Sequence, residues 1–207
     1  MGQEKIDVQK GDEPMIFNEK ALIRMLKQEF RNSNLIYGQI DDYIVFGGTT
    51  WRGCIEENFV TQGIYGEMLK LTGIYPKRDS VFTINKERIA QYTIVDMAEF
   101  KGGVNEASEM MVSKIVYDNY KRILIGKDGL LEVYEGHVEM LDQNYVTDEE
   151  DRYEGPFFDS YRNQVIWRND VCELHLLKQY SDEECPELET FEKIISKLEY
   201  DGKYTFH

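Results

Sequence analysis

Three residues in the first half of the chain have the types and the order of a metal-dependent phosphodiesterase site. Glu99 and Lys101 follow the apolar stretch 92–95 with one residue between them, and Asp79 lies upstream. Two carboxylates can hold Mg²⁺, and a lysine can stabilise developing negative charge or position a water molecule. One hypothesis is therefore a Mg²⁺-dependent nuclease with Asp79, Glu99 and Lys101 as its catalytic residues.

This order of residues resembles the Asp…Glu-x-Lys pattern of the restriction-endonuclease-like nucleases. With 24 Glu and 15 Lys in 207 residues, about 1.7 Glu-x-Lys triplets are expected by chance, and one is present. No Pro-Asp pair precedes the triplet, because Lys77 and Arg78 separate Pro76 from Asp79. The nuclease is for these reasons the second hypothesis rather than the first.

The cysteines and histidines are too scattered to predict a metal centre. Cys172 and His175 are three residues apart on an expected strand, where odd spacing sends side chains to opposite faces. A zinc site built from these residues with Cys185 and His137, or a Cys54 thiol activated by a histidine, has no local support. We expect no metal and no cofactor, and the glycine-rich stretch 47–53 is expected to be a wide turn.

The net charge of −15 is concentrated in one part of the chain. Residues 132–192 contain 18 acidic and four basic residues, a net charge of −14, whereas the other 146 residues sum to −1. Such a field repels nucleic acid and anionic lipid and attracts basic surfaces, over a range of about 8 Å at physiological salt. We therefore expect no direct binding to nucleic acid or membranes through this region.

Aromatic side chains alternate with the acidic residues of the same region. Carboxylates steer a basic partner while aromatic rings supply contact energy, so the mixture is typical of a protein-binding surface. In the alternative interpretation the rings belong to the core and the acids form a solvated surface. The residues expected to bind a partner are Asp148, Glu149, Glu150, Asp151, Tyr153, Glu154, Glu183, Glu184 and Glu187.

The leading hypothesis is a non-enzymatic acidic binding or inhibitor protein that docks on a basic partner. In charge the chain is similar to toxin-immunity proteins and to the anti-defence inhibitors of phages and mobile elements, which occupy nucleic-acid-binding grooves. That similarity implies a toxin, a nuclease or another nucleic-acid-handling enzyme as the partner, with carboxylates placed where phosphates would lie. A third hypothesis is a structural subunit of a larger assembly.

The pattern of apolar residues predicts an α+β fold in which antiparallel hairpins pack with about three helices. Hairpins are expected where paired β-rich runs flank Asp41-Asp42, Asp128-Gly129 and Asn169-Asp170. Helices are expected over 19–30, 105–120 and 182–199, from apolar stripes that follow capping residues.

Domain organisation and compartment follow from composition. Residues 1–14 are expected to be a loose arm, and 15–207 a single domain with a possible boundary near 101–105 between two halves. No apolar run exceeds about five residues, well below the roughly 20 of a membrane span. The polar start resembles no signal peptide, and an odd number of scattered cysteines favours a reducing compartment, so we expect a cytoplasmic protein.

Overall fold

The computed structural model describes residues 15–87, 90–102, 107–118, 120–127, 129–142, 154–177, 190 and 193–194. The helices are α1 (Glu19–Asn32), α2 (Gln62–Thr72) and the single turn α3 (Glu135–Val138), and the 3₁₀ turns are η1 (Glu57–Phe59) and η2 (Met97–Glu99). The strands are β1 (Leu35–Ile40), β2 (Tyr43–Gly47), β3 (Trp51–Glu56), β4 (Ser80–Ile84), β5 (Ala90–Tyr92), β6 (Ser108–Tyr117), β7 (Lys121–Gly126), β8 (Gly129–Tyr134), β9 (Glu154–Asp159), β10 (Gln164–Arg168) and β11 (Cys172–Leu177).

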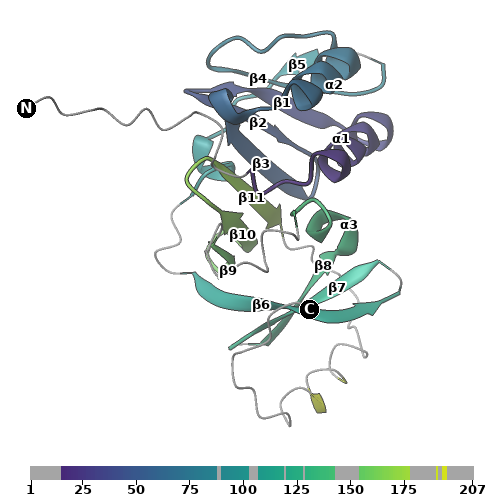
Figure 1. Cartoon of the computed structure of the whole chain (residues 1–207), viewed down its shortest axis with the longest axis vertical. Helices are drawn as coiled ribbons and strands as arrows, with labels where there is room; N and C mark the ends of the chain where they lie inside the picture. Colours follow the sequence, from purple (N-terminus) through teal and green to yellow (C-terminus); the bar gives the residue numbers. More distant parts are fainter. Residues whose placement is uncertain are drawn as a thin grey trace, which may run out of the picture.

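The strands of the described residues form one antiparallel sheet, in the order β5-β4-β1-β2-β3-β11-β10-β9-β6-β7-β8. Figure 1 shows the β1–β5 part with its two longer helices at one end and the β6–β8 hairpins at the other. The last strand, β11, lies beside β3, with His175 opposite Arg52 and Glu173 opposite Cys54. Residues far apart in sequence therefore share the middle of the sheet.

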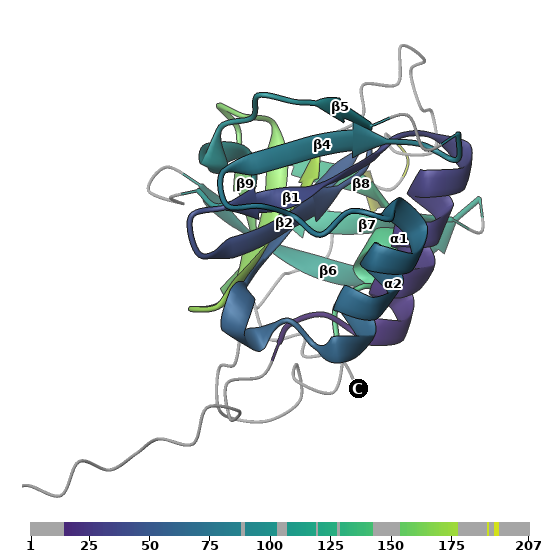
Figure 2. The same ribbon diagram turned by 90° about the horizontal axis from the view of Figure 1, so that it is seen from above.

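Helix α1 forms because its cap and its apolar stripe agree. The Asn18 side chain accepts a hydrogen bond from the Ala21 backbone N–H at 3.1 Å, which satisfies one otherwise unpaired donor of the first turn. Leu22, Leu26 and Phe30 recur at helical spacing and are buried. Figure 2 shows α1 beside α2, the two helices together covering one side of the sheet.

The two faces of the sheet are covered differently. The main core lies under α1 and α2 and includes Trp51 and Trp167, whose side chains are almost completely buried. A smaller core on the opposite face is closed by the η2 segment, whose Phe100 packs among Val45 and Cys54. Because side chains alternate along a strand, Arg52 and His175 belong to this second face.

The α+β fold class predicted from the sequence is wrong. The described chain is dominated by its eleven-stranded antiparallel sheet, and helices are a minor part of it. The helix expected over 105–120 is strand β6, paired with β7 through partners such as Val112 and Leu124. The spacing of its apolar residues fits a helix as well as a strand. Its β-branched residues favour a pleated surface, and hydrogen bonding to β7 makes the segment a strand.

Other expectations about elements are met or lie outside the described residues. The helix expected over 19–30 is α1, and the three expected hairpins are β1–β2, β7–β8 and β10–β11. Of the helix expected over 182–199, only Thr190, Lys193 and Ile194 are described, in helical conformation. The expected arm, 1–14, lies outside the described residues. No helix within the described part is long and apolar enough to cross a bilayer.

Candidate functional site

Most of the acidic residues expected to bind a partner lie outside the described residues, namely Asp148, Glu149, Glu150, Asp151, Glu183, Glu184 and Glu187, together with Tyr153. Glu154 is described as the first residue of β9 and is exposed. Its carboxylate accepts a hydrogen bond from Arg168 Nε at 2.8 Å across the β9–β10 pair.

Six described acids of the same region are engaged with basic groups of this chain. The pairs are Glu132 with Lys121 at 3.0 Å, Glu135 with Arg122, Glu139 with Arg24, Glu154 with Arg168 at 2.8 Å, Asp159 with Arg162 at 3.8 Å and Glu173 with His175 at 2.9 Å. Much of the negative charge carried by the described strands is therefore matched locally. The two denser acidic stretches, 148–151 and 182–192, lie outside the described residues apart from Thr190.

The three residues of the nuclease hypothesis have separate partners in the structure. The Asp79 carboxylate accepts a hydrogen bond from the Asp41 backbone N–H at 3.3 Å, at the β1–β2 turn. Glu99 Oε2 lies 3.8 Å from Arg52 Nε. Among the described residues, no group of three or more His, Cys, Asp or Glu side chains is arranged to hold a metal ion.

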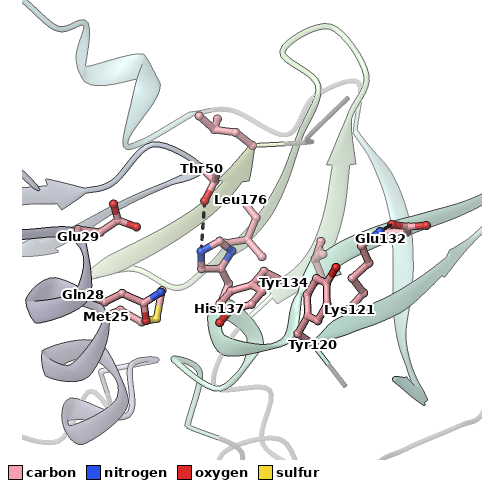
Figure 3. A pocket seen from close by; sticks show the side chains of 12 residues that line it. Met25, Gln28, Glu29, Thr50, Tyr120, Lys121, Glu132, Tyr134, His137 and Leu176 are labelled. Carbon is pink, nitrogen blue, oxygen red and sulfur yellow. Dashed lines mark hydrogen bonds and ion pairs between the residues drawn. The ribbon is translucent and has the colours of Figure 1, made fainter. Parts of the chain in front are cut away.

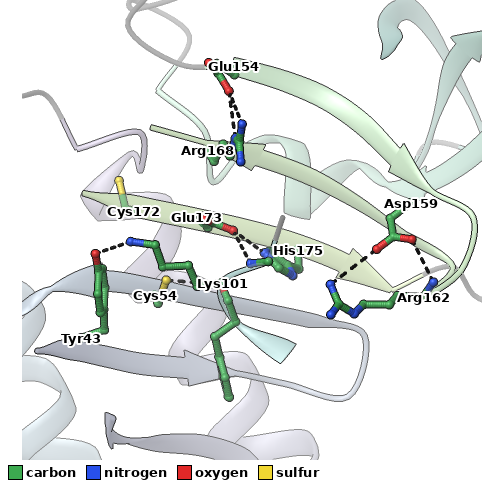
Figure 4. Close-up of polar contacts among 12 residues, drawn as sticks. Tyr43, Cys54, Lys101, Glu154, Asp159, Arg162, Arg168, Cys172, Glu173 and His175 are labelled. Atoms are coloured by element: carbon green, nitrogen blue, oxygen red, sulfur yellow. Dashed lines mark hydrogen bonds and ion pairs between the residues drawn. The ribbon is translucent and has the colours of Figure 1, made fainter. Parts of the chain in front are cut away.

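Lys101 lies on the second face of the sheet, beside a buried polar cluster. Its ammonium group donates to the Tyr43 hydroxyl and sits 4.0 Å from the centre of that ring. Figure 4 shows this contact next to the Glu173–His175 pair of β11. Glu173 Oε2 lies 2.9 Å from His175 Nε2 and also accepts from the Gly102 backbone N–H at 3.0 Å, which ties the end of the η2 segment to the sheet.

The buried cysteines have structural surroundings. Burial raises the pKa of the Cys54 thiol, whose Sγ donates to the Phe100 carbonyl at 3.3 Å. Cys172 lies in the core on the other face, because its odd spacing from His175 reverses the side-chain direction along β11. Neither cysteine is placed as an activated nucleophile, since the nucleophilic form is the thiolate and burial disfavours it.

A cavity of about 240 Å³ opens between α1, α3 and the β7–β8 hairpin, as Figure 3 shows. Its lining is mixed, with the hydroxyl of Thr50, the imidazole of His137 and the rings of Tyr120 and Tyr134. The Tyr134 ring meets His137 edge-on, with 5.2 Å between ring centres. Residues from five separate segments are brought together here: α1, the β2–β3 turn, 120–121, 132–137 and 176–177.

The Thr50 hydroxyl and the His137 ring form the polar centre of this cavity. Thr50 Oγ1 lies 3.3 Å from His137 Nε2, a distance at which a hydroxyl can donate to a neutral imidazole. Burial lowers the pKa of His137 to about 4, so the ring is neutral at pH 7. A base this weak provides little driving force for removing a hydroxyl proton, and the pair is better suited to positioning than to nucleophilic catalysis.

Glu29 supports the same cavity from α1. Its carboxylate is buried and accepts a hydrogen bond from Trp51 Nε1 at 3.2 Å. A Cβ atom at Gly48 would lie 2.1 Å from the Glu29 carboxyl carbon, so the β2–β3 turn passes directly against this carboxylate.

Sequence reasoning considered His137 only as a metal ligand or thiol partner, and it assigned Thr50 to a turn. The two residues are 87 positions apart, and no local motif marks their contact. A glycine-rich turn followed by Trp51 was the single local signal of a close approach. Long-range strand pairing, which a single sequence does not reveal, decides the rest.

The described residues thus contain paired surface acids, a buried Glu–His pair and a cavity with a neutral histidine. A scan against models of protein families finds no match to this chain, and a comparison with curated proteins finds no relative.

Proposed function

We propose that this protein is a non-enzymatic binding protein in which two acidic stretches without basic residues dock on a basic, nucleic-acid-handling partner. The observation that carries the proposal is the division of the acids into two classes. Six acids between positions 132 and 177 are paired with basic groups of this chain. The stretches 148–151 and 182–192 hold ten acids and no basic residue.

This division assigns different roles to the two classes of acid. The charge of a paired carboxylate is largely offset by the nearby intramolecular cation, so it adds little to the electrostatic field at a partner's surface. An acidic stretch without bases projects a field over about one Debye length and accelerates encounter with a basic surface by roughly 10- to 1,000-fold. The ten acids are therefore the partner-binding set, with Tyr153 as its aromatic contact.

The mode of action follows from the sign of the charge. A basic groove that binds phosphates also attracts carboxylates, so an acidic segment in that groove excludes nucleic acid without any chemical step. Because both interactions depend on charge, binding should weaken as salt rises.

Displacement of nucleic acid tests the proposal. A fluorescein-labelled DNA duplex is bound to each of a panel of basic nucleases and polymerases, and its anisotropy is followed as this protein is added at low and at physiological salt. We expect release of the duplex from at least one enzyme at micromolar protein. The double variant Glu149→Gln/Glu150→Gln should need about tenfold more protein for the same release, since it removes two charges from the proposed docking stretch.

A matched variant separates local charge from net charge. Glu139→Gln/Glu154→Gln changes the net charge by the same amount, but at acids that are paired with Arg24 and Arg168. Glu154 was expected from the sequence to bind the partner, and its pairing with Arg168 is why the proposed docking set leaves it out. We expect this control to displace DNA like the wild type. Equal losses in the two double variants, or no release from any enzyme of the panel, would contradict the proposal.

A further inference from the structure

A second hollow lies on the face of the sheet opposite α1 and α2, under the η2 segment. Its volume is about 360 Å³, within the range of roughly 300–1,000 Å³ typical of small-molecule pockets. It is lined by Arg52, Asp96, Ala98, Glu99, Arg162, Gln164 and Leu177. These residues come from β3, η2, the β9–β10 turn, β10 and β11, and all belong to the described part of the chain.

Buried hydrogen-bond donors in this lining have no acceptor within the described residues. Gln164 Nε2 belongs to a side chain that is only 2% exposed, and Arg52 Nε to one that is 14% exposed, and neither atom has a hydrogen-bond partner. Arg52 Nη1, by contrast, donates to the backbone carbonyls of Gly48 and Trp51. Leaving such donors unsatisfied costs free energy, so buried donors normally meet protein, water or a ligand. Protein atoms cover both of these nitrogens in the structure, so an acceptor in the hollow reaches them once the Gln164 and Arg52 side chains shift.

Arg162 adds a third donor group at the rim. Its Nη1 lies 3.8 Å from Asp159, beyond hydrogen-bond distance, and its side chain is 37% exposed. Figure 4 shows Arg162 on the β9–β10 turn, near the buried His175. A Cβ atom at Gly102 would lie 2.8 Å from this Nη1, so the guanidinium group passes close to the Gly102 backbone.

Two carboxylates also line the hollow and limit its positive charge. Asp96 is used locally, because its Oδ1 accepts a hydrogen bond from the Ala98 backbone N–H at 2.9 Å. Glu99 is 47% exposed and stays 3.8 Å from Arg52 Nε, so it can turn away toward solvent. We interpret Glu99 as a competing anion at the entrance, which lowers the affinity for any other anion.

We propose that this hollow binds the oxyanion group of a small molecule, held by Arg52, Arg162 and the Gln164 amide. Guanidinium groups and carboxamide N–H groups only donate, and their forked geometry matches the oxygens of a phosphate or a carboxylate. This site uses none of the residues of the proposed docking stretches, so its test is independent of the test of the function proposed above.

Side-chain NMR signals test this directly. The Gln164 Nε2 and Arg52 Nε–H resonances of the uniformly ¹⁵N-labelled full chain are followed while inorganic phosphate, or in a second arm acetate, replaces chloride at constant ionic strength and pH 7. Saturable shifts of both resonances are expected for at least one anion. Saturation by phosphate alone assigns the site to phosphorylated molecules, and saturation by acetate alone assigns it to carboxylates.

Three variants make the result decisive. Arg162→Gln lies on an exposed turn and should raise the Kd about tenfold, whereas Glu99→Gln should lower it about fivefold by removing the competing charge. Arg168→Gln is the matched control and should leave the Kd unchanged. Arg168 lies on β10, the strand that begins with Gln164, but it is paired with Glu154. Absent or non-saturating shifts, or equal effects of Arg162→Gln and Arg168→Gln, would overturn the proposal and leave water as the acceptor.

Discussion

Protonation of His137 should weaken the fold as the pH falls. The ring is 5% exposed, and burial lowers its pKa from the ordinary 6.5 to about 4. In the unfolded chain the ring takes up a proton near pH 6.5, while the folded chain resists it until about pH 4. The free energy of unfolding contributed by this group is therefore complete above pH 6.5 and is lost as the pH falls toward 4.

The size of the effect follows from these two pKa values. They differ by about 2.5, and each unit corresponds to about 1.4 kcal/mol, so the full loss is about 3 kcal/mol. Between pH 7 and pH 5 the loss amounts to about 2 kcal/mol, since the slope approaches 1.4 kcal/mol per pH unit once the unfolded ring is protonated. This is a large share of the stability of a typical domain.

The assay compares wild type with His137→Gln, which cannot titrate but can still hydrogen-bond Thr50. Urea unfolding is measured at pH 7, 6 and 5, above the sequence pI of about 4.7 where solubility is lowest. The carboxylates titrate in both proteins and cancel in the difference. We expect the variant to gain about 2 kcal/mol relative to wild type between pH 7 and pH 5.

A second variant tests the cause of the effect. Thr50→Val removes the hydroxyl 3.3 Å from His137 Nε2 but keeps the titrating ring, so it should lower stability without flattening the pH dependence. Parallel pH curves for wild type and His137→Gln would refute the reasoning, because they would mean that the buried ring takes up its proton at an ordinary pH.

Two further predictions concern the second face of the sheet. Phe100→Ala should lower the free energy of unfolding by about 3–5 kcal/mol in urea titrations, because the ring is completely buried against the sheet. Ile94 is fully exposed, so Ile94→Ala should lower the free energy of unfolding by no more than about 0.5 kcal/mol. Equal effects of the two variants would contradict this packing. Cys54 and Cys172 are buried thiols, so mass spectrometry after a short pulse of iodoacetamide should find both modified only in urea, and rapid native labelling of either would contradict their burial.

Local signals in the sequence were sufficient for the hairpins and the first helix. The β1–β2 turn has Asp41 at a φ of 51°, a left-handed conformation that Asp tolerates better than most residues, and β-rich apolar runs lie on both sides of it. The cap residue Asn18 likewise lies within about two helical turns of Leu22 and Leu26, the first residues of the apolar stripe of α1. Such signals act over a few residues, so a single sequence contains them in full.

The misread segment and the candidate sites depend on distant partners. The segment that forms β6 has apolar residues compatible with either a helix or a strand, and β7 decided the outcome by offering a ladder of hydrogen bonds. The Glu99–Lys101 triplet was recognised in the sequence, yet the structure directs its two side chains to Arg52 and to Tyr43. Side-chain direction on an irregular turn is set by what packs against it.

By itself the sequence determined where the charge lies, because charge follows directly from residue type, and it determined the elements that short-range capping and turn chemistry can specify. Tertiary structure alone decided which acids are neutralised and which residues meet. It brought Thr50 to His137, and Arg52 to Gln164, by pairing strands from opposite ends of the chain. The physical reason is that hydrogen-bond ladders and burial are collective, so the surroundings of each side chain exist only once the whole sheet has formed.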